Sequence, residues 1–281
     1  TTSECTDYKK EPILAIKGYD EMPPFFMSLI SRDNLWAFIS SRGSLTAGRE
    51  SAEKSIFPYV TVDKIHDNYG ATGPRTMIRL EGNDLWEPFT PHAAKEPDIE
   101  RTLSKGILGN SICFEERRVR SGLSFKYRWQ PAGRFGLART ACLENCSNQT
   151  VKLNILDGIA NILPPGLDSR MQANSSVLTD AYKQSELQSN SRMALYSTAS
   201  GITDRPEPME NLRANCAWSS GLDEAAVTLA TKVPDAMIEA EDSESKGMAI
   251  FFRFLSLVWS VAVAYRLAYA TEVQFVSFKE K

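Results

Sequence analysis

The chain has 281 residues, of which 42% are hydrophobic and 24% are charged, with 32 basic against 35 acidic side chains. This is enough apolar sequence for one large domain or two ordinary ones, and it excludes a disordered chain. The near balance of charge argues against a nucleic-acid-binding protein, in which basic residues usually gather on one face.

Residues 1–33 are expected to form an N-terminal extension and the first strands. Residues 1–12 are rich in charge and lack the apolar run of a secretory signal, so we expect a cytoplasmic protein. The cysteines are odd in number and form neither a C-x-x-C pair nor a zinc pattern, which predicts free thiols in a reducing compartment. They are Cys5, Cys113, Cys142, Cys146 and Cys216.

From residue 35 to residue 155 the sequence is typical of β-strands. The best two-residue period is in residues 123–129, where four large apolar side chains alternate with Ser124, Lys126 and Arg128. Gly, Pro and Asn turns separate such segments, which favours antiparallel β-sandwich packing over alternating strands and helices. The apolar face consists of Leu123, Phe125, Tyr127 and Trp129.

The middle of the chain predicts one helix, over residues 176–187, followed by strands over 193–197 and 212–218. No linker is long enough to mark a boundary, so residues 34–220 are expected to form one β-domain. Residues 221–281 are left as a tail without an assigned structure.

The tail changes from acidic to strongly apolar near residue 246. Only 12 uncharged residues separate Arg253 from Arg266, whereas a membrane helix needs about 20 apolar residues. Three interpretations of residues 246–270 stay open: a membrane helix with snorkelling arginines, a buried strand or helix, and a terminus altered by truncation or a frame shift.

No sequence motif points to nucleotide or metal binding. The chain lacks G-x-x-x-x-G-K-[ST] and G-x-G-x-x-G, and neither His66 nor His92 sits in a zinc pattern. Glu115 and Glu116 are neighbours on a strand, so they point to opposite faces and cannot flank one glycosidic bond. We expect one of them to be solvated and the other to lie in an ion pair.

Tryptophans in the β region are candidate sugar contacts, because an aromatic plane can pack on the apolar face of a sugar ring. Trp36, Trp86 and Trp129 all lie there. Residues 87–89 (Glu-Pro-Phe) follow Trp86, so this ring is expected in a loop at a strand end, where ligand contacts usually lie. Trp129 is more typical of a core residue.

Five segments, in order, resemble the N-terminal β-domain of cellobiose phosphorylase-type glycoside phosphorylases (glycoside hydrolase family 94). They are NLWAFISS (34–41), LTAGRES (45–51), IFPY (56–59), LWEPFTP (85–91) and LENCSNQTVKL (143–153). The likeness covers roughly residues 34–156. In the family, the second segment carries aromatic side chains that this chain lacks.

The resemblance implies a mainly β fold, an antiparallel β-supersandwich similar to galactose mutarotase, with one or two short helices. In that family an (α/α)6 barrel follows and holds the catalytic acid and the phosphate site. No such barrel fits after residue 220, so the chain is expected to be a non-catalytic domain or fragment that binds carbohydrate and supports the barrel.

The resemblance also suggests partners and site residues. An oligosaccharide or sugar phosphate is the expected ligand, and homodimerisation is expected. Inorganic phosphate would be a co-substrate of the intact enzyme only, and no cofactor or metal is expected here. The candidate substrate contacts are Trp86, Arg42 and Arg49, since an arginine fork can bind phosphate or vicinal hydroxyls through two hydrogen bonds.

Two other functions remain as alternatives. A small mutarotase-like epimerase would need a positioned acid and base, for which His66 or His92 with one carboxylate are the candidates. A membrane-anchored interaction module would use residues 248–265. Membrane association is not favoured, and no nucleic-acid partner is expected.

Overall fold

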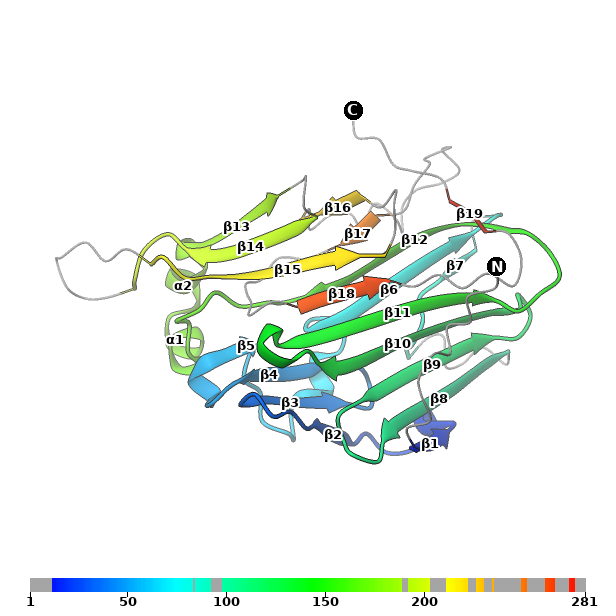
Figure 1. Cartoon of the computed structure of the whole chain (residues 1–281), viewed down its shortest axis with the longest axis horizontal. Helices are drawn as coiled ribbons and strands as arrows, with labels where there is room; N and C mark the ends of the chain where they lie inside the picture. Colours follow the sequence, from blue (N-terminus) through cyan, green and yellow to red (C-terminus); the bar gives the residue numbers. More distant parts are fainter. Residues whose placement is uncertain are drawn as a thin grey trace.

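The computed structural model describes residues 12–82, 84–91, 98–188, 192–202, 211–221, 226–229, 234, 249–251, 261–265 and 273–275. Side chains are described in these segments except at residue 134 and in the last three segments. The fold is mainly antiparallel β and of β-sandwich type, as the alternating sequence predicted (Figure 1).

A nine-stranded sheet forms the largest layer. Its central strands pair in register along their whole length, for example Tyr127 opposite Ala141 and Phe114. In spatial order the strands are β1 (Ile13–Lys17), β8 (Ile99–Gly106), β9 (Ile112–Arg118), β10 (Leu123–Pro131), β11 (Leu137–Asn145), β18 (Val261–Tyr265), β15 (Ala214–Ser220), β14 (Met193–Thr198) and β13 (Lys183–Gln188).

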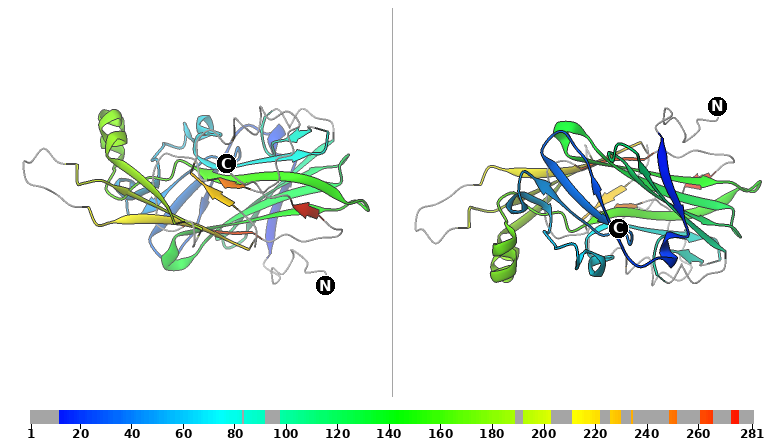
Figure 2. Two further views of the ribbon diagram at one scale, coloured as in Figure 1. Left: turned by 90° about the horizontal axis from the view of Figure 1, so that it is seen from above. Right: turned by 90° about the horizontal axis from the view of Figure 1, so that it is seen from below.

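Two smaller sheets complete the sandwich (Figure 2). The first contains β16 (Ala226–Thr228), β17 (Ala249–Phe251), β12 (Val151–Ala160), β6 (Gly73–Leu80) and β7 (Leu85–Trp86), with β19 (Val273–Phe275) beside β12. The second contains β2 (Phe26–Leu29), β3 (Leu35–Ser40), β4 (Leu45–Arg49) and β5 (Ser55–Phe57).

The core lies between these sheets. In β10 the predicted apolar face is buried, and Trp129 has no exposed surface, in agreement with a core role. Leu153, Ile155 and Ile159 of β12 belong to the same hydrophobic cluster. Burial of alternate side chains on facing sheets is what holds such layers together.

Helical structure is short. The predicted helix over residues 176–187 is present only as α2 (Ser176–Tyr182), because β13 begins at Lys183 and pairs with β14. Before it lies α1 (Ser169–Asn174), whose first turn is capped by the Asp168 carboxylate, an acceptor for the Met171 N–H. Single 3-10 turns are η1 (Tyr19–Glu21), η2 (Ala52–Lys54), η3 (Ile65–Asn68) and η5 (Gly133–Phe135).

Segments outside residues 34–220 pair with the β-domain. Strand β1 hydrogen-bonds to β8, and β18 lies between β11 and β15, parallel to both. The pieces of residues 246–270 that the structure describes, β17 and β18, are therefore strands, and the rest of that segment lies outside the described residues. No helix in the described part of the chain is long and apolar enough to cross a membrane.

The prediction of free thiols throughout is wrong at one position. Cys142, in β11, is disulfide-bonded, whereas Cys113 and Cys146 are free. The spacing of cysteines in a sequence does not tell which of them meet in space, so this bond could not be read from the sequence.

Candidate functional site

Trp86 lies in the core instead of in an exposed loop. It ends β7, pairs with Ile78 of β6, and is only 2% exposed. Its indole Nε1 donates a hydrogen bond of 2.6 Å to Glu116 Oε1. The ring therefore offers no face to a ligand: Trp86 lies at a strand end, as predicted, but in the strand and buried, not in a loop. A buried indole N–H needs an acceptor, and Glu116 supplies it.

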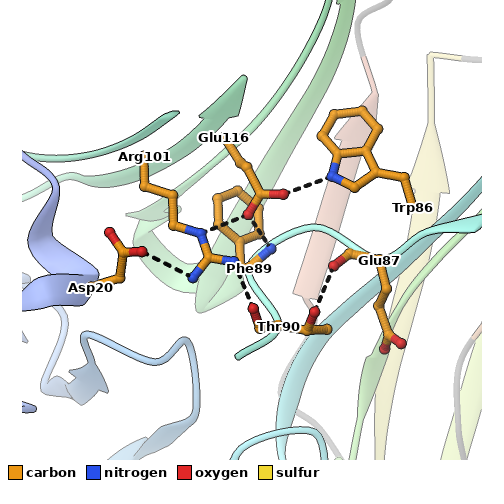
Figure 3. A network of polar contacts seen from close by, with 7 residues as sticks. All are labelled: Asp20, Trp86, Glu87, Phe89, Thr90, Arg101 and Glu116. Carbon is orange, nitrogen blue, oxygen red and sulfur yellow. Dashed lines mark hydrogen bonds and ion pairs between the residues drawn. The ribbon is translucent and has the colours of Figure 1, made fainter. Parts of the chain in front are cut away.

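Glu116 is the centre of a buried polar network (Figure 3). Its Oε2 accepts a 2.5 Å bond from the Phe89 backbone N–H and a 2.8 Å bond from Arg101 Nε. Arg101 in turn donates through Nη2 to the Thr90 carbonyl at 2.6 Å, and its Nη1 lies 3.6 Å from an Asp20 carboxylate oxygen. The network ties the segment after β7 to β8, β9 and η1.

The electrostatics of Glu116 follow from its burial. The side chain has no exposed surface, and this desolvation raises the pKa of its carboxyl, while Arg101 and the N–H donors act in the opposite direction. Glu115 points to the other face of β9, half-buried, and accepts a 3.3 Å bond from Ser124 Oγ. The two carboxylates diverge and Glu116 lies in an ion pair, as predicted, whereas Glu115 is half-buried and hydrogen-bonded instead of fully solvated.

A second charged pair, which the sequence analysis missed, lies fully buried between β11 and β12. Arg139 and Asp157 are joined by two bonds, Nη1 to Oδ2 at 2.6 Å and Nη2 to Oδ1 at 2.9 Å. Thr76 also donates its hydroxyl to Asp157, and the guanidinium lies 4.7 Å from the centre of the Tyr127 ring. The two-residue alternation of β11 could have predicted the burial of Arg139, because Arg139 lies on the same face of the strand as buried Leu137.

A small depression opens where the turn after β3 meets the segment after β7. Arg42 and Gly43 of the turn line it, together with Tyr69, Arg75, Glu87 and Tyr127. Its volume is about 10 Å³, which is enough for a single water-sized group. The structure thus brings Arg42, one of the predicted contacts, beside the segment that follows Trp86, and Trp86 itself does not line the depression.

Arg49 lies elsewhere. It ends β4, paired with Leu35 at the open end of the β3–β4 hairpin, whereas Arg42 lies in the turn at the closed end. The Arg49 side chain is half-buried, and its Nη1 donates a 3.1 Å bond to the Asp33 carbonyl. The two predicted arginines therefore do not converge on one ligand position.

A row of four aromatic side chains lies beside β3, and we call it the aromatic stripe. It consists of Phe26, Phe38, Trp36 and Tyr59, with ring centroids 6.1, 6.2 and 5.9 Å apart in that order. Phe26 and Tyr59 are 44% and 43% exposed, and the two middle rings are half-buried. Trp36 and Phe38 alternate with buried Leu35, Ala37 and Ile39, which was the available sequence signal.

Trp36 is held in place from below and from the side. A Cβ atom on Gly48, its partner in β4, would lie only 2.5 Å from Trp36 Cζ2, so the ring packs directly over this glycine. Its indole Nε1 donates a 3.2 Å bond to the Ser51 carbonyl. The stripe is therefore anchored at its largest ring, which needs little further ordering to receive a ligand.

The two histidines do not assemble an acid–base pair among the described residues. His66 Nδ1 lies 2.7 Å from Ser40 Oγ, and the structure gives His66 no hydrogen bond to a carboxylate. Ser40 itself has no exposed surface. His92 lies outside the residues that the structure describes. Within the described part of the chain, no group of three His, Cys, Asp or Glu side chains could hold a metal ion.

No protein-family model matches this chain, and a comparison with curated proteins finds no match. The functional assignment therefore depends on the geometry of the stripe, the depression and the buried networks.

Proposed function

We propose that this chain is a carbohydrate-binding β-domain of glycoside phosphorylase type, which holds an oligosaccharide on the aromatic stripe and supports an (α/α)6 catalytic barrel. Its role in this proposal is non-catalytic, and the parent activity is transfer of a glycosyl group. The observation that carries the proposal is the stripe itself, four neighbouring rings on a sheet surface, of which two are more than 40% exposed.

Several physical features support carbohydrate as the ligand. A pyranose ring has an apolar C–H face that packs on an aromatic plane, and its hydroxyls remain free to bind polar groups or water. The centroid spacings of 5.9–6.2 Å set successive rings at about the length scale of one monosaccharide. Exposed aromatic groups in a row are also unusual on a surface that has no partner.

The same proposal includes homodimerisation and a cytoplasmic location. Two free thiols, Cys113 and Cys146, agree with a reducing compartment, whereas the disulfide at Cys142 argues against one. Alkylation of protein taken directly from cells would decide between these: a Cys142 that reacts as a free thiol supports the cytoplasm, and a Cys142 that stays bonded contradicts it.

The test is calorimetric titration of the full chain with cellobiose and cellotetraose. Trp36→Ala and Tyr59→Ala should each weaken binding of the tetrasaccharide about tenfold, the size of one lost aromatic contact. Phe135→Ala is the matched control, since this ring is 47% exposed but pairs with Trp218 and with none of the four stripe rings in the described contacts. Absence of binding at millimolar sugar, or equal losses in all three variants, would contradict the proposal.

A further inference from the structure

The phenol groups of Tyr69 and Tyr127 line the depression beside Arg42. Tyr127 is 2% exposed, and its hydroxyl lies 3.1 Å from the position that a Cβ on Gly43 would occupy. Tyr69 lines the same space. Among the described residues, no hydrogen bond is made by either hydroxyl, although both are next to a space that one oxygen atom would fill. Tyr127 is buried and Tyr69 is half-buried, so both hydroxyls are placed to donate to an acceptor that enters this space.

The rim of the depression has an excess of positive charge. Two guanidinium groups, Arg42 and Arg75, stand against one carboxylate, Glu87. Arg75 Nε is bound to Glu87 Oε1 at 2.7 Å, which neutralises this pair. Arg42 is exposed and makes no ion pair with any described residue. The lining therefore carries a net charge of +1 and more hydrogen-bond donors than acceptors, which favours an anion.

The phenol groups remain donors at neutral pH. Burial raises the pKa of Tyr69 and of Tyr127 above the ordinary tyrosine range, although Arg75 and Arg139, respectively, oppose this. Both side chains therefore stay protonated and offer O–H groups to an acceptor.

The turn that carries Arg42 is fixed before any ligand arrives. The Gly43 N–H donates to the Ser40 carbonyl at 2.8 Å, and the Arg42 N–H donates to Ser40 Oγ at 3.1 Å. Ser44 donates its hydroxyl to the Ile65 carbonyl and so ties the turn to η3. Gly43 has φ +90, which favours glycine, and its missing side chain leaves the Tyr127 hydroxyl open to the depression.

We propose that this depression binds a tetrahedral oxyanion, a phosphate or sulfate group either free or carried by a sugar. One oxygen enters between the Tyr69 and Tyr127 hydroxyls, and the remaining oxygens lie outside against the Arg42 guanidinium. The volume of about 10 Å³ admits one oxygen and no more, so the rest of the group stays at the rim. This site is separate from the aromatic stripe and does not depend on it.

The experiment is calorimetric titration of the full chain with inorganic phosphate, sulfate, glucose 1-phosphate and glucose. Arg42→Ala and Tyr69→Phe should each weaken phosphate binding about tenfold, as expected for loss of one hydrogen bond to a charged group. Arg170→Ala, at an exposed arginine of α1, is the control and should leave binding unchanged. Binding should also weaken as ionic strength rises.

The outcomes distinguish the sources of the oxyanion. Equal binding of phosphate and glucose 1-phosphate assigns the site to the free group, and tighter binding of the sugar phosphate adds a contact to its sugar; both support the proposal. Glucose binding as tightly as glucose 1-phosphate, no binding of any anion, or equal losses in Arg42→Ala and Arg170→Ala would overturn it. Cellotetraose binding in the Arg42→Ala variant tests the stripe separately.

Discussion

Two buried charged side chains of the core, Glu116 and Arg139, each make several hydrogen bonds. Glu116 accepts hydrogen bonds from the Trp86, Phe89 and Arg101 N–H groups. Arg139 and Asp157 are joined by two hydrogen bonds. Removing a charge from water is costly, and only this density of hydrogen bonds offsets it. Such pairs are more sensitive to loss of one partner than surface ion pairs are, because the remaining charge stays buried.

This sensitivity gives a direct prediction for Glu116. Glu116→Gln removes the charge that faces Arg101 but keeps the size of the side chain, and it should lower the free energy of unfolding by about 3 kcal/mol. The measurement is urea unfolding at neutral pH. Glu115→Gln, on the opposite face of the same strand, should change stability by less than about 0.5 kcal/mol. If the two variants were equally stable, the buried Glu116–Arg101 pair would not contribute to the free energy of unfolding.

The residue scale is also where the sequence was least informative. The Glu-Pro-Phe sequence after Trp86 predicts a loop at a strand end, whereas the carboxylate that satisfies its buried indole N–H lies 30 positions further along the chain. Conversely, Glu115 and Glu116 were correctly separated, because strand geometry sends neighbours to opposite faces. Local patterns predict the direction of a side chain, whereas its partner comes from a distant strand.

Among the elements, the β3–β4 hairpin combines stability with the candidate binding surface. Its inner face contributes Ile39, Leu45 and Ala47 to the core, and its outer face carries Trp36 over Gly48. The close approach of the Trp36 ring explains why a glycine stands inside β4, one residue before its end, where its backbone flexibility would otherwise be unfavourable.

Gly48→Ala is therefore expected to lower both the stability of the protein and its affinity for saccharide. The added methyl group would lie 2.5 Å from the Trp36 ring and 2.6 Å from the Lys54 carbonyl, which should lower stability by about 1–3 kcal/mol. It should also weaken cellotetraose binding, because the ring must move. Thermal unfolding and calorimetry measure the two effects. The Trp36→Ala/Gly48→Ala double variant should lose less than the sum of the single variants, and strict additivity would show that ring and glycine do not interact.

At the level of elements, the sequence predicted regular strands well and boundaries less well. The alternation over residues 123–129 predicted the buried face of β10. The helix expected over residues 176–187 ends at Tyr182, since pairing of Lys183–Gln188 with β14 overrides the helical pattern. Whether a segment continues as helix or joins a sheet depends on a neighbouring strand that no local pattern reveals.

For the whole molecule, the continuity of the large sheet depends on β18. This strand lies between β11 and β15 and pairs in parallel with both, so it joins β1, β8, β9, β10 and β11 to the group of β13, β14 and β15. Likewise, β17 lies between β12 and β16. The apolar segment after residue 246 thus supplies strands that close two gaps in the sandwich, an arrangement that the sequence left among three alternatives.

Deletion of residues 246–281 should leave β11, β12, β15 and β16 with open hydrogen-bonding edges. We expect a lower melting temperature and self-association, because open edges pair with other chains. Differential scanning calorimetry and light scattering on the shortened and full chains would measure this. A shortened chain that melts at the same temperature and stays monomeric would show that these strands do not stabilise the sheets.

The tryptophans differ in solvent exposure, so their intrinsic fluorescence can report on ligand binding. Trp86 and Trp129 are shielded from solvent, whereas the Trp36 indole lies in the half-buried stripe. Iodide would quench the fluorescence of Trp36 and of the similarly half-buried Trp218, and leave that of the two shielded indoles almost unchanged. A saccharide covering the stripe would protect the Trp36 part of the quenchable emission, which a Trp36→Phe variant identifies, so occupancy could be followed by fluorescence without labelling the protein.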